Sequence, residues 1–217
     1  ENVGVKHLIN YKTVAERKEN MLWFRAPEKV YFKRGCLGVA LKELGHQVYN
    51  KKKAFIVTDG FLYQSGFTKK ITDILDAEGI THATFFNVTP DPTLACANEG
   101  VKQMRDFAPD VIIAVGGGSP MDAAKGAAAR VVHPHKPVNK MAGLFKVMHK
   151  IPTFVAVPTT AGTGSETTIA AVITDQDTHH KYAIMDLCLV PKYAILDPEL
   201  TRNLPPKTTS TTGMDAL

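Results

Sequence analysis

The apolar residues of this chain fall into short continuous runs, separated by longer stretches in which apolar residues recur every three or four positions. Short runs rich in Val, Ile and Phe are typical of strands buried on both faces of a sheet, and the recurring pattern is typical of amphipathic helices. The runs predict strands at 30–32, 54–58, 82–88, 111–115, 153–157 and 194–196. The recurring pattern predicts helices at 35–44, 61–78, 93–107 and 120–131.

Strands that alternate with helices indicate a parallel sheet covered on both faces, with right-handed crossovers between successive strands. Residues 168–174 and 180–185 flank the sequence DQDT (175–178), which we interpret as the turn of a β-hairpin. The predicted fold class is therefore α/β: a doubly wound, Rossmann-like parallel sheet with a β-hairpin.

The first 26 residues show only weak periodicity, and we interpret them as a linker or arm. Their apolar residues, Leu22 and Trp23 among them, form no closed pattern and must pack on another domain, on a neighbouring subunit or on the chain's own body. The chain begins without Met and shows no signal-peptide core, so we expect a fragment or a processed form.

Composition narrows the classes of function. Of the 217 residues, 44% are hydrophobic and 22% are charged, which is ordinary for a folded domain. The net charge is +5, but the basic residues are scattered, so nucleic acid is not an expected partner. No apolar run approaches the roughly 20 residues of a membrane-spanning helix. Cys36, Cys96 and Cys188 are odd in number and form no C-x-x-C pair, which favours a reducing cytoplasm.

The strongest chemical signal is the sequence GGGSPMDAAK (116–125), which joins a predicted buried strand to a predicted helix. Glycines allow a backbone to approach phosphate oxygens closely, and the amides at a helix start present partial positive charge to an anion. The simpler alternative is a tight turn without a ligand. Asp122 is expected in the first helical turn, where capping is its simplest role because a carboxylate would repel phosphates.

The spacing of these glycines differs from the common dinucleotide fingerprint. Gly116 and Gly118 fit G-x-G, but Met121 stands at the third glycine position, and no suitable acid ends a strand about 20 residues later. Instead, Asp59 follows the predicted strand 54–58. A carboxylate there can accept hydrogen bonds from a ribose and would repel the additional phosphate of NADP. A role as a helix N-cap is an equally good interpretation.

A second loop, PTTAGTGSE (158–166), also leaves a predicted buried strand. Its four hydroxyls and two glycines suit the binding of sugar and phosphate oxygens. A plain polar turn explains this composition less well, because the carboxyl ends of parallel strands bring the two loops to one edge of the sheet.

These two motifs, in this order, resemble the iron-dependent (group III) alcohol dehydrogenase family. The shorter sequences ENMLW, VYFKRG, IVTD, DPT and TGMDAL are similar to the alcohol dehydrogenase half of bifunctional aldehyde–alcohol dehydrogenases. The opening ENVGVKHLIN resembles the segment that tethers that half to a preceding aldehyde dehydrogenase domain. The resemblance covers essentially all 217 residues.

The resemblance implies NAD as a cofactor and assigns residues to it. The matching positions are Asp59 at the adenosine ribose, Asp91 lining the cleft, Gly117, Gly118, Ser119 and Asp122 in the first loop, Thr159, Thr160, Thr163 and Thr168 in the second, and Lys181. Without the resemblance, Lys181 is better interpreted as a solvated lysine of the hairpin.

Asp215, in TGMDAL (212–217), matches the first metal ligand of the family. The family's metal is Fe²⁺, with Zn²⁺ as an alternative, and its other ligands are histidines of a helical domain that follows. None of the eight histidines here lies in a matching motif, so we expect an incomplete metal site. The expected domains are a linker at 1–26, a dinucleotide-binding domain at 27–204 and the beginning of the helical metal-binding domain at 205–217.

The implied reaction is NAD-dependent interconversion of a short-chain aldehyde and its alcohol, such as acetaldehyde and ethanol. The metal would polarise the oxygen and the cofactor would exchange hydride. The expected partners are this small substrate, the preceding aldehyde dehydrogenase domain, the helical domain and further copies in a homo-oligomer or filament. The alternatives are a nucleotide-binding or assembly fragment without turnover, and a relative of glycerol dehydrogenase or dehydroquinate synthase, against which the second loop argues.

Overall fold

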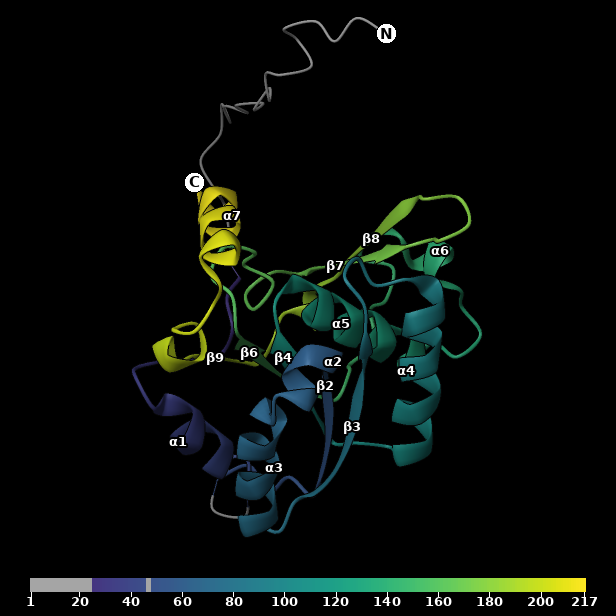
Figure 1. Ribbon diagram of the computed structural model, residues 1–217. Helices are drawn as coiled ribbons and strands as arrows, with labels where there is room; N and C mark the ends of the chain where they lie inside the picture. The colour runs from purple at the N-terminus through teal and green to yellow at the C-terminus, as the bar shows by residue number, and fades with distance from the viewer. Residues whose placement is uncertain (1–24, 46–47) are drawn as a thin grey trace, which may run out of the picture.

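A parallel sheet lies at the centre of the computed structural model, which describes residues 25–45 and 48–217 (Figure 1). Its strands in the described part of the chain are β1 (Lys29–Phe32), β2 (Lys53–Asp59), β3 (Thr81–Val88), β4 (Val111–Gly116), β6 (Thr153–Pro158) and β9 (Tyr193–Leu196). They are ordered β1-β9-β6-β4-β2-β3, and neighbouring strands run parallel. Every residue of β4 is buried, as its Val- and Ile-rich sequence predicts.

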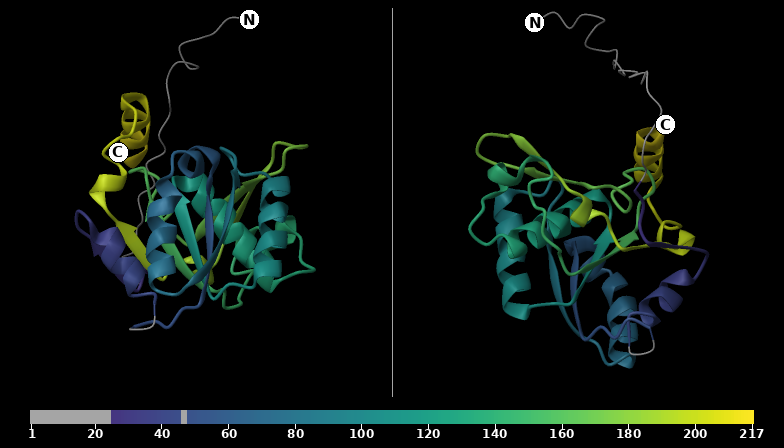
Figure 2. Two further views of the ribbon diagram at one scale, coloured as in Figure 1. Left: turned by 60° about the horizontal axis from the view of Figure 1, so that its bottom comes forward. Right: turned by 180° about the vertical axis from the view of Figure 1, so that it is seen from behind.

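Helices cover both faces of this sheet (Figure 2). Successive residues of a strand point to opposite faces, so Ile56 packs with α1 (Cys36–Lys42) and α3 (Phe67–Ala77). Its neighbour Phe55 packs on the other face, with α4 (Leu94–Phe107) and α5 (Gly118–Val132). The structure thereby confirms the predicted doubly wound α/β class.

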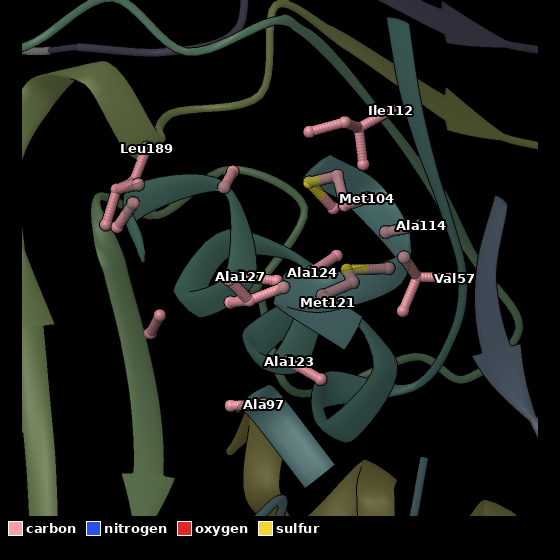
Figure 3. Close-up of a cluster of buried hydrophobic side chains, with 14 of the residues drawn as sticks. Val57, Ala97, Met104, Ile112, Ala114, Met121, Ala123, Ala124, Ala127 and Leu189 are labelled. Atoms are coloured by element: carbon pink, nitrogen blue, oxygen red, sulfur yellow. The ribbon is translucent and has the colours of Figure 1, made fainter. Parts of the chain in front are cut away.

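Small side chains allow α5 to lie close to its neighbours. Ala123, Ala124 and Ala127 are buried, and Figure 3 shows them in one cluster with residues of α4 and β4. A Cβ on Gly126 would lie 2.9 Å from Cδ1 of Ile173, on β7 (Ala170–Thr174). The alanines and Gly126 therefore fix how the helix that follows the glycine motif sits on the sheet and on β7.

The predicted hairpin is confirmed, because β7 pairs antiparallel with β8 (Lys181–Met185). A short strand that the pattern did not predict, β5 (Gly143–Leu144), runs parallel to β8 and extends this second sheet. The short helix α6 (Val138–Met141) was not predicted either.

Two helix boundaries differ from the prediction. The helix expected at 61–78 is two helices, α2 (Gly60–Gln64) and α3, because Gly66 between them adopts φ 74°, outside the helical region. The helix expected from residue 120 begins at Gly118, so Asp122 lies beyond the first turn. The capping role expected for Asp122 is therefore wrong.

The end of the chain forms two 3₁₀ turns, η2 (Leu187–Leu189) and η3 (Pro198–Leu200), and the helix α7 (Pro206–Ala216). Helix α7 has no buried residue and rises away from the sheet (Figure 1). In the part of the chain that the structure describes, no helix is long and apolar enough to cross a membrane. The arm predicted at 1–26, including Trp23, lies outside the described residues apart from its last two positions.

Candidate functional site

The loops after β2 and β4 leave neighbouring strands in opposite directions. From β2 the chain continues to β3 at one edge of the sheet, whereas from β4 it continues to β6 on the other side. In a doubly wound sheet, ligands bind in the crevice at such a switch point, at the carboxyl ends of the strands. Asp59 ends β2 and the glycine motif follows β4, so both lie at this point.

A pocket of about 770 Å³ opens at this edge of the sheet. Asp59, Gly117, Thr159 and Thr160 line it, so residues from three loops, all assigned to the cofactor from sequence, come together. The remaining lining is largely apolar and includes Leu37, Leu62, Phe67, Ile74, Leu200 and Leu204. An apolar cavity with a few converging polar groups is the usual form of a cofactor site.

The first loop needs glycine for two different reasons. Gly116 has φ 141°, and a Cβ there would lie 2.6 Å from Cγ of Pro120. Gly117 precedes α5, and a Cβ on it would lie 3.1 Å from Oγ1 of Thr160. The missing side chains leave room for a ligand beside the start of α5, where the first amides have no partner within the helix.

The second loop faces the first. The Thr159 amide donates to the Gly116 carbonyl at 2.9 Å. The Thr160 hydroxyl is buried and has no hydrogen-bond partner in the described structure. A buried hydroxyl without a partner is costly, and one that lines a pocket suits a ligand with sugar or phosphate oxygens. The residues present therefore fit a dinucleotide.

Asp59 is the N-cap of α2. Its Oδ1 accepts a hydrogen bond from the Leu62 amide at 2.9 Å, which confirms the alternative role considered for it. The carboxylate also lines the pocket and has lone pairs beyond those that one amide uses. Capping is thus compatible with a contact to a ribose, which stays a prediction.

Asp91 and Lys181 do not line this pocket. They form an exposed ion pair with each other, with 3.1 Å between Lys181 Nζ and Asp91 Oδ1. The pair joins the turn after β3 to the start of β8. A hydrogen bond of 2.8 Å from the Thr174 amide to the Pro92 carbonyl holds the same turn to the end of β7, where Thr174 pairs with Lys181.

The other predicted cofactor residues lie where the two loops meet. A Cβ on Gly118 would lie 3.4 Å from Cγ2 of Thr163, at ordinary contact distance. Ser119 follows Gly118 in the first turn of α5 and is half-buried. Asp122 accepts hydrogen bonds from Ser165 Oγ at 3.3 Å and from the Val172 amide at 3.1 Å. Its burial raises the pKa of the carboxyl.

Lys125, which no sequence motif assigned to the site, is fully buried. Its Nζ donates to the carbonyls of Ser165 at 2.7 Å, Thr168 at 2.8 Å and Ala170 at 3.0 Å. Burial lowers the pKa of Lys125 to about 8. The available signal was a lysine inside an alanine-rich helix, three residues after Asp122 and so on the same face.

Asp215, the predicted metal ligand, is exposed on α7. A carboxylate oxygen is a suitable donor for Fe²⁺. Among residues 25–45 and 48–217, however, no group of three or more His, Cys, Asp or Glu side chains could hold a metal ion. The described residues do not make a metal site by themselves.

The chain is similar in sequence to known alcohol dehydrogenases. The chain is 45% identical to the bifunctional aldehyde-alcohol dehydrogenase AdhE of Escherichia coli K12, over 100% of this chain and 25% of that protein. It is 38% identical to the NADPH-dependent butanol dehydrogenase of Clostridium saccharobutylicum, over 91% of this chain and 50% of that protein.

Solved structures of similar fold include a 1,3-propanediol oxidoreductase, with a TM-score of 0.84, 34% identity, and coverage of 90% of this chain and 50% of that one. They also include the sulfoacetaldehyde reductase of Bifidobacterium kashiwanohense in complex with NAD⁺, with a TM-score of 0.77, 30% identity, and coverage of 90% of this chain and 51% of that one. The chain thus spans about a quarter to a half of the length of these relatives.

A match to a protein family extends over most of the α/β domain. Residues 27–198, which include every predicted cofactor residue, match the family described as iron-containing alcohol dehydrogenase. This match and the relatives do not favour the glycerol-dehydrogenase-like alternative. The chain belongs to the iron-containing alcohol dehydrogenase family.

Proposed function

We propose that this chain is the nucleotide-binding part of an NAD(H)-dependent alcohol dehydrogenase that interconverts a short-chain aldehyde and its alcohol, such as acetaldehyde and ethanol. The observation that carries the proposal is the buried, unpartnered hydroxyl of Thr160 opposite Gly117, in a pocket at the switch point of the sheet. The likeness to a reductase solved with NAD⁺ supports the choice of cofactor.

The residues of this chain would bind and orient the dinucleotide. The amides at the start of α5 would receive the phosphates, since the partial positive charge of a helix N-terminus favours an anion. The Thr160 hydroxyl would donate a hydrogen bond to a ligand oxygen. The apolar lining beside Leu37 and Leu204 would exclude water from the bound cofactor. The cofactor itself supplies or accepts the hydride.

Asp59 would select NAD(H) over NADP(H). A 2′-phosphate placed beside this carboxylate would bring two negative charges together in a partly dehydrated pocket. The butanol dehydrogenase of Clostridium saccharobutylicum, a relative of this chain, is described as NADPH-dependent. Cofactor choice therefore varies among the relatives and must be tested on this chain.

The proposal extends to the setting of the whole protein. The similarity to a bifunctional aldehyde-alcohol dehydrogenase supports a preceding aldehyde dehydrogenase domain as a partner. A helical domain would supply the remaining ligands of the metal site. Assembly into a homo-oligomer or filament in the cytoplasm belongs to the same proposal.

The test is a titration of the chain with NADH, followed by fluorescence. We expect NADH fluorescence to increase on binding to the unmodified chain, and this increase to be lost in Gly117→Val. A branched side chain at that position would meet Thr160 and fill the space beside the start of α5 that the phosphates need. Gly213→Val is the matched control, since a Cβ on Gly213 meets nothing within 4 Å. Binding by Gly117→Val equal to that of the control, with an unchanged circular dichroism spectrum, would refute the phosphate role.

Oxidation of NADH with acetaldehyde then separates an enzyme from a binding fragment. The assay needs the full-length protein loaded with Fe²⁺, because the described residues of this chain hold no group of metal ligands. NADH binding without turnover in that protein would favour the nucleotide-binding alternative.

A further inference from the structure

Lys125 is a charged residue at a place where an apolar one would be expected. It lies on α5 with 0% of its surface exposed, among buried alanines and glycine. Lysine is almost never fully buried without partners, because removing an ammonium from water costs far more than packing its carbon stem recovers. Its retention in the core therefore points to what the charged end contacts.

The ammonium contacts one short segment of backbone. Three carbonyl oxygens, those of Ser165, Thr168 and Ala170, lie within 3.0 Å of Nζ. An ammonium has three protons and no acceptor, so the three nearest acceptors, all carbonyls, match its donors in number, and the Thr168 hydroxyl lies further from Nζ at 3.4 Å. This segment joins the second cofactor loop to β7, and each of its ends is held by the same side chain.

From one helical turn earlier, Asp122 holds the start of the same segment and the strand β7 that follows it. Its carboxylate accepts from the Ser165 hydroxyl at 3.3 Å and from the Val172 amide at 3.1 Å. Ser165 is thus held twice by α5, at its hydroxyl by Asp122 and at its carbonyl by Lys125. Because α5 begins in the glycine loop, one rigid helix connects both cofactor loops.

We propose that Lys125 is a positioning residue that, with Asp122, fixes the second loop at the distance from the glycine loop that a dinucleotide requires. The proposal rests on the proposed cofactor function. Lys125 does not touch the ligand in it. The side chain acts through the backbone of Ser165 and Thr168, and so sets the places of the threonines that precede them.

The charge on Lys125 gives this role a dependence on pH. The charged groups that act on the ammonium, among the described residues, are Asp122 on the same helix and Glu166 on the loop, and both raise its pKa. Burial outweighs them and lowers the pKa to about 8. Above that pH the neutral amine has two protons for three carbonyls, so one contact to the loop loses its donor.

The first test measures the loop directly, without a ligand. We expect Lys125→Met, which retains an unbranched side chain one atom shorter and removes its donors, to increase amide hydrogen exchange in residues 163–170 by at least tenfold. Lys102→Met, at an exposed lysine of α4, is the matched control. Exchange in Lys125→Met equal to that of the control would overturn the proposal, whatever the chain binds.

The second test measures NADH affinity against pH in the unmodified chain. We expect the affinity to fall at least threefold between pH 7 and pH 9, and to be at least tenfold weaker and independent of pH in Lys125→Met. Lys125→Arg, which restores donors, should recover part of the loss at pH 7. If Lys125→Met fails to fold by circular dichroism, a flat profile in the unmodified chain would overturn the proposal.

The two tests separate this proposal from the proposed function. If the unmodified chain binds no NADH, the proposed function fails, and hydrogen exchange still decides whether Lys125 holds the loop. If NADH binds and the exchange does not change, the positioning role fails alone.

Discussion

Lys181 and Asp91 form an ion pair across 3.1 Å, so two residues that the family resemblance assigned separately to the cofactor contact each other. Their side chains are 58% and 74% exposed. An exposed pair of this kind contributes at most about 1 kcal/mol to stability. The pair is therefore available to a ligand, since breaking it costs little.

We expect Lys181→Met and Asp91→Asn each to change the midpoint of thermal unfolding by no more than a few degrees, because both side chains are exposed. Lys181→Met should also weaken NADH binding severalfold, because it removes a cation that can leave its weak, exposed ion pair and turn towards the cofactor. Titration of both variants by fluorescence checks this. Equal affinity in Lys181→Met and the unmodified chain would show that the lysine belongs to the hairpin alone.

Asp59 should have two separable effects, one on folding and one on cofactor choice. Asp59→Asn retains an N-cap acceptor for the Leu62 amide and removes the charge, whereas Asp59→Ala removes both. We expect both variants to bind NADPH about tenfold more tightly than the unmodified chain does, on the order of one 1.4 kcal/mol step. Only Asp59→Ala should lose stability, by about 1 kcal/mol.

Parallel NADH and NADPH titrations and urea unfolding of the two variants check this prediction. The unmodified chain should prefer NADH. Equal affinity of the unmodified chain for both cofactors would remove the role given to Asp59, while the N-cap would stand.

Gly162, in the second loop, packs directly against the backbone of α7. Its φ is 142°, and a Cβ on it would lie 2.0 Å from the Thr212 carbonyl oxygen in α7. Gly164 also has positive φ, at 65°, but a Cβ there meets nothing within 4 Å. Gly162→Ala must therefore move the loop and α7 apart, whereas Gly164→Ala incurs only a backbone strain of about 1–2 kcal/mol.

Limited proteolysis of the two variants measures this difference. We expect faster cleavage within α7 in Gly162→Ala than in Gly164→Ala, because the helix loses its contact with the loop. Asp215 lies three residues beyond Thr212, so the same displacement would move the candidate metal ligand relative to the cofactor loops. Equal cleavage rates in the two variants would show that the contact between Gly162 and Thr212 does not hold α7 in place.

Lys125 should also leave a signature in the dependence of stability on pH. Its pKa is lowered from 10.5 to about 8 in the folded chain. Between these two values the unfolded chain holds a proton that the folded chain has released, so the free energy of unfolding rises with pH, by at most about 1.4 kcal/mol per unit. Below pH 8 both states are protonated and the slope vanishes.

Urea unfolding at pH 7.5, 8.5 and 9.5 checks this slope by comparing the unmodified chain with Lys125→Met. The difference between the two should rise with pH across this range, because other titrating groups are common to both. A constant difference would mean that Lys125 keeps its usual pKa in the folded chain.

Asp215 by itself should hold a metal only weakly. It offers one exposed carboxylate, which cannot compete with the hydration of a divalent ion. We expect this 217-residue chain to retain far less than one equivalent of Fe²⁺ or Zn²⁺ after dialysis, and Asp215→Asn to change nothing in it. Metal analysis measures both. A stoichiometric, tightly held ion would show that other ligands complete the site.

The sequence by itself determined the fold class and the order of the main elements. Val111 to Val115 and the runs like it are long enough and apolar enough to be buried strands, and the stretches between them have helical periodicity. The family motifs also placed Asp59, Gly117, Thr159 and Thr160 on loops at one edge of the sheet, and the structure brings these four to one pocket. Local pattern was sufficient because strand direction alone decides where such loops lie.

Tertiary structure decided the remaining features. Periodicity did not reveal the break at Gly66, because a glycine with φ 74° interrupts the helix without changing the apolar pattern on either side. It did not reveal that Asp91 pairs with Lys181, which lies 90 residues away in the sequence. Nor did it reveal Lys125, whose three carbonyl partners lie 40 to 45 residues further along the chain. Contacts between distant segments depend on how a helix sits on the sheet, and that depends on packing that no local pattern contains.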